Sequence, residues 1–160
     1  MRRLVAEARL DFHPQRCLIG PAPDEILLHY VVASGRFQGP GIELTAVANC
    51  GAEWDTVRGD GVILFESRHV LHTPAEDLVC ASLTGLYDVG DDGYVDALDD
   101  VLSTVPAEFS VRFYTGALEY RWLNRTLFVG QGRRDFALHT LSLHIYALEA
   151  ERPGSHYSGT

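Results

Sequence analysis

Short apolar segments alternate along the chain with turn-forming glycine, proline and aspartate. These segments are too short for most helices and are rich in β-branched and aromatic residues, which is typical of strands. Eight of them can be delimited: residues 4–12, 26–33, 42–48, 62–73, 78–87, 109–114, 122–129 and 136–148. About eight strands joined by short turns predict an all-β protein, either an antiparallel sandwich or an up-and-down β-barrel. A closed barrel also leaves no exposed strand edge.

One segment has helical rather than strand periodicity. Between residues 95 and 105 the apolar side chains recur at helical spacing, and Pro106 follows directly. Since proline ends a helix, the pattern predicts one short helix over residues 95–105. We expect this helix to lie across a barrel mouth.

The length and composition fit one globular domain. The chain has 160 residues, of which 46% are apolar and 22% are charged, as in ordinary folded proteins. We expect residues 1–150 to form a single domain. Residues 151–160 carry no apolar periodicity and are expected to be a disordered tail.

Charge and hydropathy limit the partners. The net charge is −9 and no basic stripe is present, so nucleic acid is not an expected partner. No apolar stretch approaches ~20 residues, and charged residues interrupt the N-terminus before any signal-like run. We therefore expect a cytoplasmic protein without membrane contact, and a homodimer would fit the usual symmetry of soluble proteins.

Common metal and cofactor motifs are missing from the sequence. The three cysteines are widely spaced and form no CxxC pair, which favours buried free thiols. The acidic turn at residues 88–93 departs from the EF-hand pattern and is interpreted as solvated. No GxSxG, P-loop, Rossmann or HExxH motif occurs, so the sequence predicts neither a metal nor a cofactor.

The strand at residues 62–73 carries the most conspicuous polar row. Strand alternation places Glu66, Arg68 and His72 on one face. On the outside of the sheet they would form a weak surface network. Pointing inward, they would cost several kcal/mol unless paired, which usually marks a functional site. Arg68 would then anchor an anionic oxygen while Glu66 or His72 moves protons.

Aromatic residues supply candidate walls for a ligand. Trp122, Asn124 and Phe128 would share one face if residues 122–129 form a strand, giving an apolar wall with one amide group. Trp54 precedes a Gly-Asp-Gly turn, where a large ring covers the end of a barrel either as a lid or as a core plug. Core packing is the alternative for all these rings.

Several segments together resemble one family. Gly39-Pro40, then Gly51-Ala52-Glu53-Trp54, then Glu66-Ser67-Arg68 and Trp122-Leu123-Asn124-Arg125 are similar to motifs of the family called domain of unknown function 3237. The resemblance runs from about Phe12 to Leu148 and implies a lipocalin-like antiparallel barrel. Some family members belong to natural-product biosynthesis. The chain has glutamates at 53 and 66 where the family has aspartates.

Two functions follow from these features. The first is a cofactor-independent cyclase, dehydratase or isomerase acting on a hydrophobic oxygenated intermediate inside the barrel, with Glu66, Arg68 and His72 as catalytic residues. The alternative is a barrel that binds a small hydrophobic or aromatic ligand as a carrier or sensor. A purely structural or interaction domain is a third hypothesis.

Overall fold

Strands account for most of the chain. The computed structural model describes residues 2–149, which form nine strands and two short helices. The strands are β1 (Arg2–Ile19), β2 (Glu25–Gly39), β3 (Ile42–Ala46), β4 (Ala52–Arg58), β5 (Val62–His72), β6 (Leu78–Asp88), β7 (Thr104–Thr115), β8 (Leu127–Asp135) and β9 (Thr140–Leu148). The α-helix α1 (Gly93–Leu98) lies between β6 and β7, and the 3-10 helix η1 (Leu118–Arg125) lies between β7 and β8.

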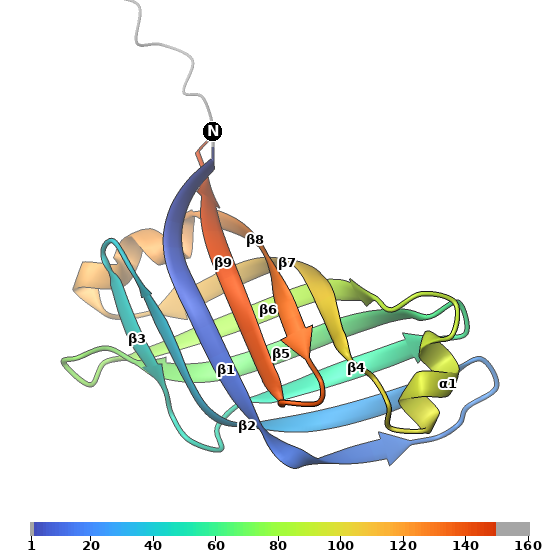
Figure 1. Ribbon diagram of the computed structural model, residues 1–160. Coiled ribbons are helices and arrows are strands. Elements are labelled where there is room, and N and C mark those ends of the chain that lie inside the picture. Colours follow the sequence, from blue (N-terminus) through green and yellow to red (C-terminus); the bar gives the residue numbers. More distant parts are fainter. Residues whose placement is uncertain (1, 150–160) are drawn as a thin grey trace, which may run out of the picture.

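The strands close into one antiparallel barrel (Figure 1). β1, β9, β8, β7, β6 and β5 pair in that order, and β1 pairs with β2 on its other side. The gap between β2 and β5 is filled twice, because β3 and β4 each pair with both of these strands. Nine strands therefore occupy eight positions around the ring. The predicted up-and-down barrel with one short helix is confirmed, with one strand more than expected.

The interior of the barrel is the hydrophobic core. Successive side chains of a strand point to opposite faces, so every second residue points inward. In β7 buried and exposed residues alternate without interruption from Thr104 to Thr115. Inward-pointing rings such as Phe65, Phe109 and Phe128 are almost inaccessible to solvent.

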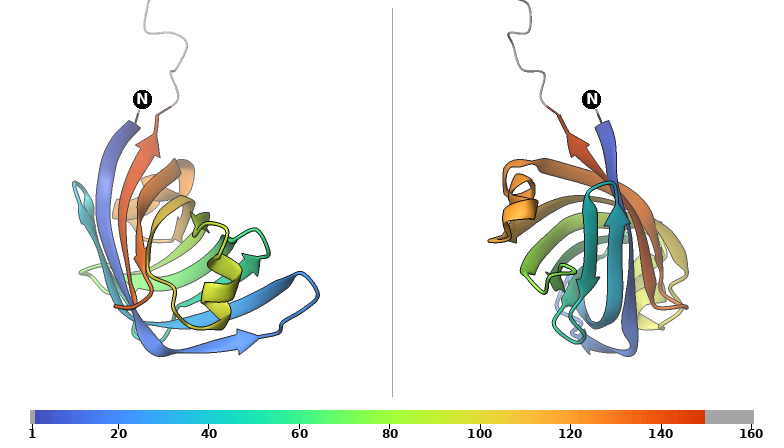
Figure 2. Two further views of the ribbon diagram at one scale, coloured as in Figure 1. Left: turned by 45° about the vertical axis from the view of Figure 1, so that its right-hand side comes forward. Right: turned by 90° about the vertical axis from the view of Figure 1, so that its left-hand side faces the viewer.

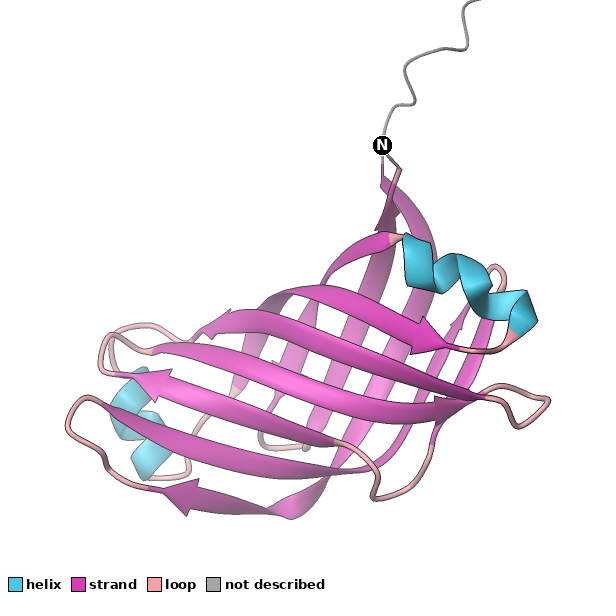
Figure 3. Ribbon diagram, turned by 180° about the vertical axis from the view of Figure 1, so that it is seen from behind, coloured by secondary structure: helices cyan, strands magenta, loops and turns pink. Residues whose placement is uncertain are grey.

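The two helices mark opposite ends of the barrel (Figure 3). One end of the barrel is the end that carries α1, and we call it the helix end. There β4, β6 and β8 finish, and β5, β7 and β9 begin. There α1 lies against the opening, as the left view of Figure 2 shows. The η1 end is the opposite one, where β7 finishes and β8 begins.

Residues 89–103, which include α1, cover the helix end, and we call them the cover. The cover is anchored by the buried side chains of Ala97 and Leu102. One ion pair also joins it to the barrel, because Arg16 Nε on β1 lies 3.2 Å from Asp100 Oδ1. The expected position of a helix across a barrel mouth is thus observed.

The boundaries of the predicted helix are wrong. α1 ends at Leu98, and Thr104 already begins β7, so Pro106 lies in a strand rather than after a helix. The proline is tolerated because pairing of β7 with β6 begins only at Ala107, while Pro106 pairs with Arg133 of β8. Its missing N–H therefore leaves no gap in the ladder to β6.

A second element differs from its prediction. Residues 122–125 belong to η1, and the strand expected over residues 122–129 begins only at Leu127. Trp122, Asn124 and Phe128 consequently do not share one face of a strand. The strand β4, in contrast, was not predicted at all.

The cysteine prediction is wrong in part. All three cysteines are free, but Cys17 and Cys50 are exposed and Cys80 is half-buried. Cys17 belongs to the outer face of β1, and Cys50 lies in the loop before β4.

No helix in residues 2–149 is long and apolar enough to cross a membrane. The predicted disordered tail, residues 151–160, lies outside the described residues.

Candidate functional site

The polar row predicted on β5 lies on the outside of the barrel. Glu66 and Arg68 are exposed, whereas Ser67 and His69, which alternate with them, point inward and are buried. Of the two orientations considered from the sequence, the outward one is observed. The catalytic role of this row stays a prediction.

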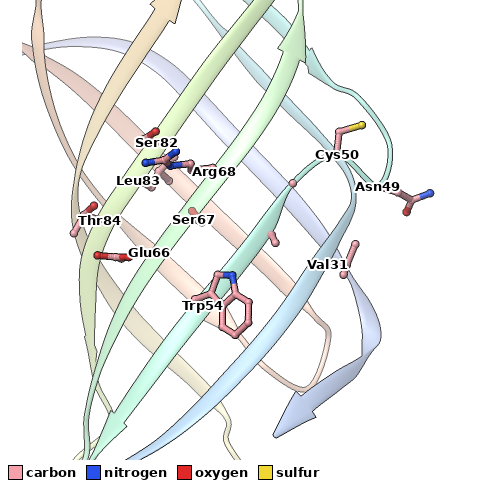
Figure 4. A pocket seen from close by; sticks show the side chains of 12 residues that line it. Val31, Asn49, Cys50, Trp54, Glu66, Ser67, Arg68, Ser82, Leu83 and Thr84 are labelled. Carbon is pink, nitrogen blue, oxygen red and sulfur yellow. The ribbon is translucent and has the colours of Figure 1, made fainter. Parts of the chain in front are cut away.

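Glu66 and Arg68 line an open groove on the outer wall (Figure 4). The groove has a volume of about 740 Å³ and lies over β2, β4, β5 and β6. Trp54 of β4 also lines it, with 46% of its surface exposed. Trp54 is therefore neither a core plug nor a lid over a barrel end, and the structure brings it together with Glu66 and Arg68.

His72 lies outside this groove, at the end of β5. Its Nδ1 is 3.2 Å from the carbonyl oxygen of Thr73 and 3.7 Å from the Glu76 carboxylate. These local contacts separate it from the other two members of the predicted row.

Trp122, Asn124 and Phe128 are at the η1 end. The Trp122 and Phe128 ring centroids are 5.9 Å apart, and Phe128 is fully buried. The Asn124 amide accepts a hydrogen bond from the Thr115 N–H (2.9 Å) and donates one to the Thr115 carbonyl (2.8 Å). The structure therefore does not place these three residues with Trp54, and their contacts are those of a structural corner.

Buried charges come instead from β4 and β8. Glu53 and Asp55 point into the barrel on either side of the outward Trp54, and Arg134 points inward from β8; all three are inaccessible to solvent. Glu53 Oε1 accepts a hydrogen bond from Arg134 Nε at 3.2 Å, and Glu53 Oε2 accepts one from the Tyr87 hydroxyl at 3.0 Å. We call Tyr30, Glu53, Asp55, Tyr87 and Arg134 the acid cluster.

Aromatic rings fix the guanidinium of Arg134. Its central carbon lies 4.1 Å from the ring centroid of Phe12, 4.5 Å from that of Phe136 and 4.9 Å from that of Tyr30. Burial alone would lower the pKa of Arg134, but the Glu53 carboxylate beside it holds that pKa above its usual value. The cluster thus contains a permanent, immobile cation, and its Nη2 has no hydrogen-bond partner in the described chain.

Asp55 is the aspartate of the acid cluster, and its pKa differs strongly from that of an ordinary aspartate. No donor group among the described residues is hydrogen-bonded to either of its carboxyl oxygens, but the Glu53 carboxylate lies within hydrogen-bonding reach of them. Burial, and then the negative charge of Glu53, raise the pKa of Asp55 well above 3.8. This shift favours the protonated, neutral form of Asp55, which can donate a proton. The charges of Glu53 and Arg134 compensate each other inside the barrel.

The two phenols of the cluster are also held protonated. Burial, with a contribution from Asp55, raises the pKa of Tyr30 to about 12. Burial and the Glu53 carboxylate raise the pKa of Tyr87 well above 10.0. Both hydroxyls therefore remain hydrogen-bond donors.

The acid cluster lies near the helix end, beneath the cover. Tyr87 is the second-last residue of β6 and Arg134 the second-last of β8. Glu53 and Asp55 were not among the predicted site residues, because the pattern around Trp54 did not indicate a strand. Two carboxylates at i and i+2, within a β-branched and aromatic stretch, were the signal that could have indicated them. Within residues 2–149, no three His, Cys, Asp or Glu side chains are grouped so that they could hold a metal ion.

Fold and site together define a class of protein: a closed antiparallel β-barrel that encloses an acid–arginine cluster under a helical cover. The chain belongs to the family described as protein of unknown function (DUF3237), which it matches over residues 3–148. The family resemblance noted from the sequence is thereby confirmed. No curated protein matches the sequence.

Solved structures share the fold. A protein of unknown function from Clostridium acetobutylicum is 18% identical, with a TM-score of 0.79 over 93% of this chain and 99% of its own. A β-barrel-like protein from Acinetobacter baumannii is 19% identical, with a TM-score of 0.78 over 93% and 96%. An enzyme from Penicillium herquei is 17% identical, with a TM-score of 0.66 over 93% and 94%. At these identities the likeness shows the fold alone.

Proposed function

We propose that the protein is a cofactor-independent enzyme, of the cyclase, dehydratase or isomerase type, that moves protons on a hydrophobic oxygenated intermediate of natural-product biosynthesis. The observation that supports this proposal is Asp55, a fully buried carboxyl group that receives no hydrogen bond from a donor group of the described chain and lies within hydrogen-bonding reach of Glu53, itself paired with Arg134. Burying such groups costs several kcal/mol, and proteins accept this cost mostly at functional sites. The fold shared with the Penicillium herquei enzyme is compatible with a catalytic role.

The acid cluster contains both a proton donor and a proton acceptor. Asp55 carries a proton that it can give to a substrate oxygen or carbanion, and the Glu53 carboxylate is a proton acceptor. Arg134, held in place by its aromatic neighbours, stabilises negative charge that develops on a carbonyl oxygen. Two carboxyl groups that hold one proton between them can thus both give and take a proton, with no other group required.

The surroundings of the cover fit a hydrophobic substrate. Val95, Leu98 and Val101 of the cover are exposed, as are Leu18 and Ile19 at the neighbouring end of β1. In our proposal the substrate reaches the cluster when the cover moves away from the barrel. The enclosed position of the cluster then excludes water during proton transfer.

Proton transfer can be tested before the natural substrate is known. We expect the protein to catalyse exchange of the α-hydrogens of bicyclic ketones such as 2-tetralone with solvent deuterium, measured by proton NMR in D2O. Asp55→Asn removes the acid without changing the shape of the side chain, and should lower the protein-dependent exchange rate roughly 100-fold or more. Asp24→Asn, at an exposed position outside the cover, is the control.

A carrier or sensor is the second candidate function, favoured by the same enclosure of the cluster. In that case hydrophobic ketones bind and are recovered unchanged, without deuterium. Binding that occurs with no protein-dependent exchange would therefore argue against the enzyme.

A further inference from the structure

The outer groove carries a second, independent set of ligand-binding features. Its polar and aromatic side chains form two rows that cross three strands: Trp54, Glu66 and Thr84 in one row, Ala52, Arg68 and Ser82 in the next. Residues two apart on a strand are about 6.6 Å apart along it, and cross-strand neighbours are closer. Glu66 therefore lies next to both groups: Trp54 is its neighbour on the adjacent strand, and Arg68 is its neighbour on the same face of β5.

Both charges of the groove are free. Neither Glu66 nor Arg68 has an ion-pair or hydrogen-bond partner within residues 2–149, although they are only two positions apart on one face. Figure 4 shows their side chains extended over β6, toward Thr84 and Ser82 respectively. Arg112 of β7 continues the second row beyond Ser82 and adds positive charge on that side. The small side chains of Ala52 and Ser82 leave room beside Arg68.

Trp54 provides a prepared stacking surface. His29 of β2 packs against it, with ring centroids 4.3 Å apart and an interplanar angle of 46°. This contact restrains the indole while nearly half of its surface stays exposed in the groove. A restrained exposed indole binds flat aromatic rings at low entropic cost.

We propose that the groove binds a zwitterionic aromatic α-amino acid. In such a molecule the α-carbon carries the ammonium and the carboxylate side by side, and one methylene group separates it from the ring. This matches the neighbouring charges of Glu66 and Arg68 with the Trp54 ring next to them. Each of the two free charges then meets an opposite charge, whereas a simple aromatic anion would leave Glu66 unpaired. The net charge of −9 also disfavours anions in general. This site does not depend on the acid cluster, because Trp54, Glu66 and Arg68 point away from the barrel interior.

Trp54 itself can report the binding. In the Trp122→Phe variant it is the only tryptophan, and its fluorescence is excited selectively at wavelengths where phenyl compounds do not absorb. We would titrate this variant with L-phenylalanine, with 3-phenylpropionate, which lacks the ammonium group, and with phenethylamine, which lacks the carboxylate. We expect a saturable change with phenylalanine and at least about threefold weaker binding of both analogues, as for exposed charge pairs.

Two charge-removing variants assign the contacts. Arg68→Gln should abolish the preference for phenylalanine over phenethylamine, and Glu66→Gln should abolish the preference over 3-phenylpropionate. Arg133→Gln, an exposed arginine of β8 outside the groove, should leave both preferences unchanged. If Trp122→Phe does not fold, chemical-shift mapping on the unaltered protein with the same three compounds gives the same readout. Equal binding of all three, or no saturable response to phenylalanine, would overturn the proposal.

Discussion

At the scale of single residues, the titration of Asp55 should be visible in the stability of the whole protein. Because the pKa of Asp55 is raised on folding, this residue holds its proton more tightly in the folded chain than in the unfolded chain at every pH between 3.8 and the raised value. The contribution of Asp55 to stability therefore falls as the pH rises through that window. The loss is about 1.4 kcal/mol for each unit by which the pKa is raised.

Asparagine at this position has no proton to lose, so Asp55→Asn removes the pH-dependent penalty. We expect this variant to gain stability over the unaltered protein as the pH rises from 4 to 7. Urea unfolding at several pH values measures the difference. Asp24→Asn, on the surface and outside the cover, should run parallel to the unaltered protein. If Asp55→Asn also runs parallel, Asp55 is not a protonated buried acid.

The sequence indicated that charged residues form the candidate site, but it did not indicate which charged residues the barrel buries. Glu66 and Arg68 were candidates for buried charges because both faces of their strand are partly apolar, so that strand alternation does not distinguish the inner face from the outer one. In β4 the pattern is reversed: the large apolar Trp54 points to solvent, while Glu53 and Asp55 point inward. The barrel interior accepts these acids only because Arg134, from a distant strand, compensates one of them. Such a pairing is invisible in a local pattern.

At the scale of elements, the cover depends on one glycine in the turn between β4 and β5. Gly61 has a φ of +83°, and a Cβ at this position would overlap the carbonyl oxygen of Gly90. The Val89 N–H donates to the Gly61 carbonyl at 3.2 Å. We expect Gly61→Ala to destabilise the protein by more than about 1 kcal/mol, from backbone strain and overlap together.

The same variant should release the cover. Hydrogen exchange of the amides in residues 93–102 should quicken more than exchange in β7 and β9. Gly59→Ala provides a matched control in the same turn, because a Cβ there would make only an ordinary contact, 3.9 Å from the Asp24 carbonyl oxygen. It should change stability by no more than about 0.5 kcal/mol. Equal exchange in the two variants would show that Gly61 does not hold the cover.

Most strands were predictable because each has its own apolar face, but the bounds of α1 and the existence of β4 were not. α1 is short because only Ala97 of its turn and Leu102 beyond it are anchored in the core, and the following residues join β7. β4 was missed because its inward face is largely acidic. Both differences arise from contacts between segments far apart in the sequence, which override local propensity.

At the scale of the whole molecule, ring closure should make the barrel a single cooperative unit. β1 pairs with β9 on one side and with β2 on the other, so the two terminal regions of the fold complete the ring. Separating any one strand from the barrel would break its hydrogen bonds to two neighbouring strands.

Trp54 on the β4 wall and Trp122 at the η1 end report on distant parts of this ring. We expect Trp54→Phe and Trp122→Phe, each with one remaining tryptophan, to unfold in urea with the same midpoint by fluorescence as by far-ultraviolet circular dichroism. Separate fluorescence and dichroism midpoints within either variant would show that the barrel consists of two folding units. The prediction of a single domain would then be wrong, although the closed topology of the strands would stand.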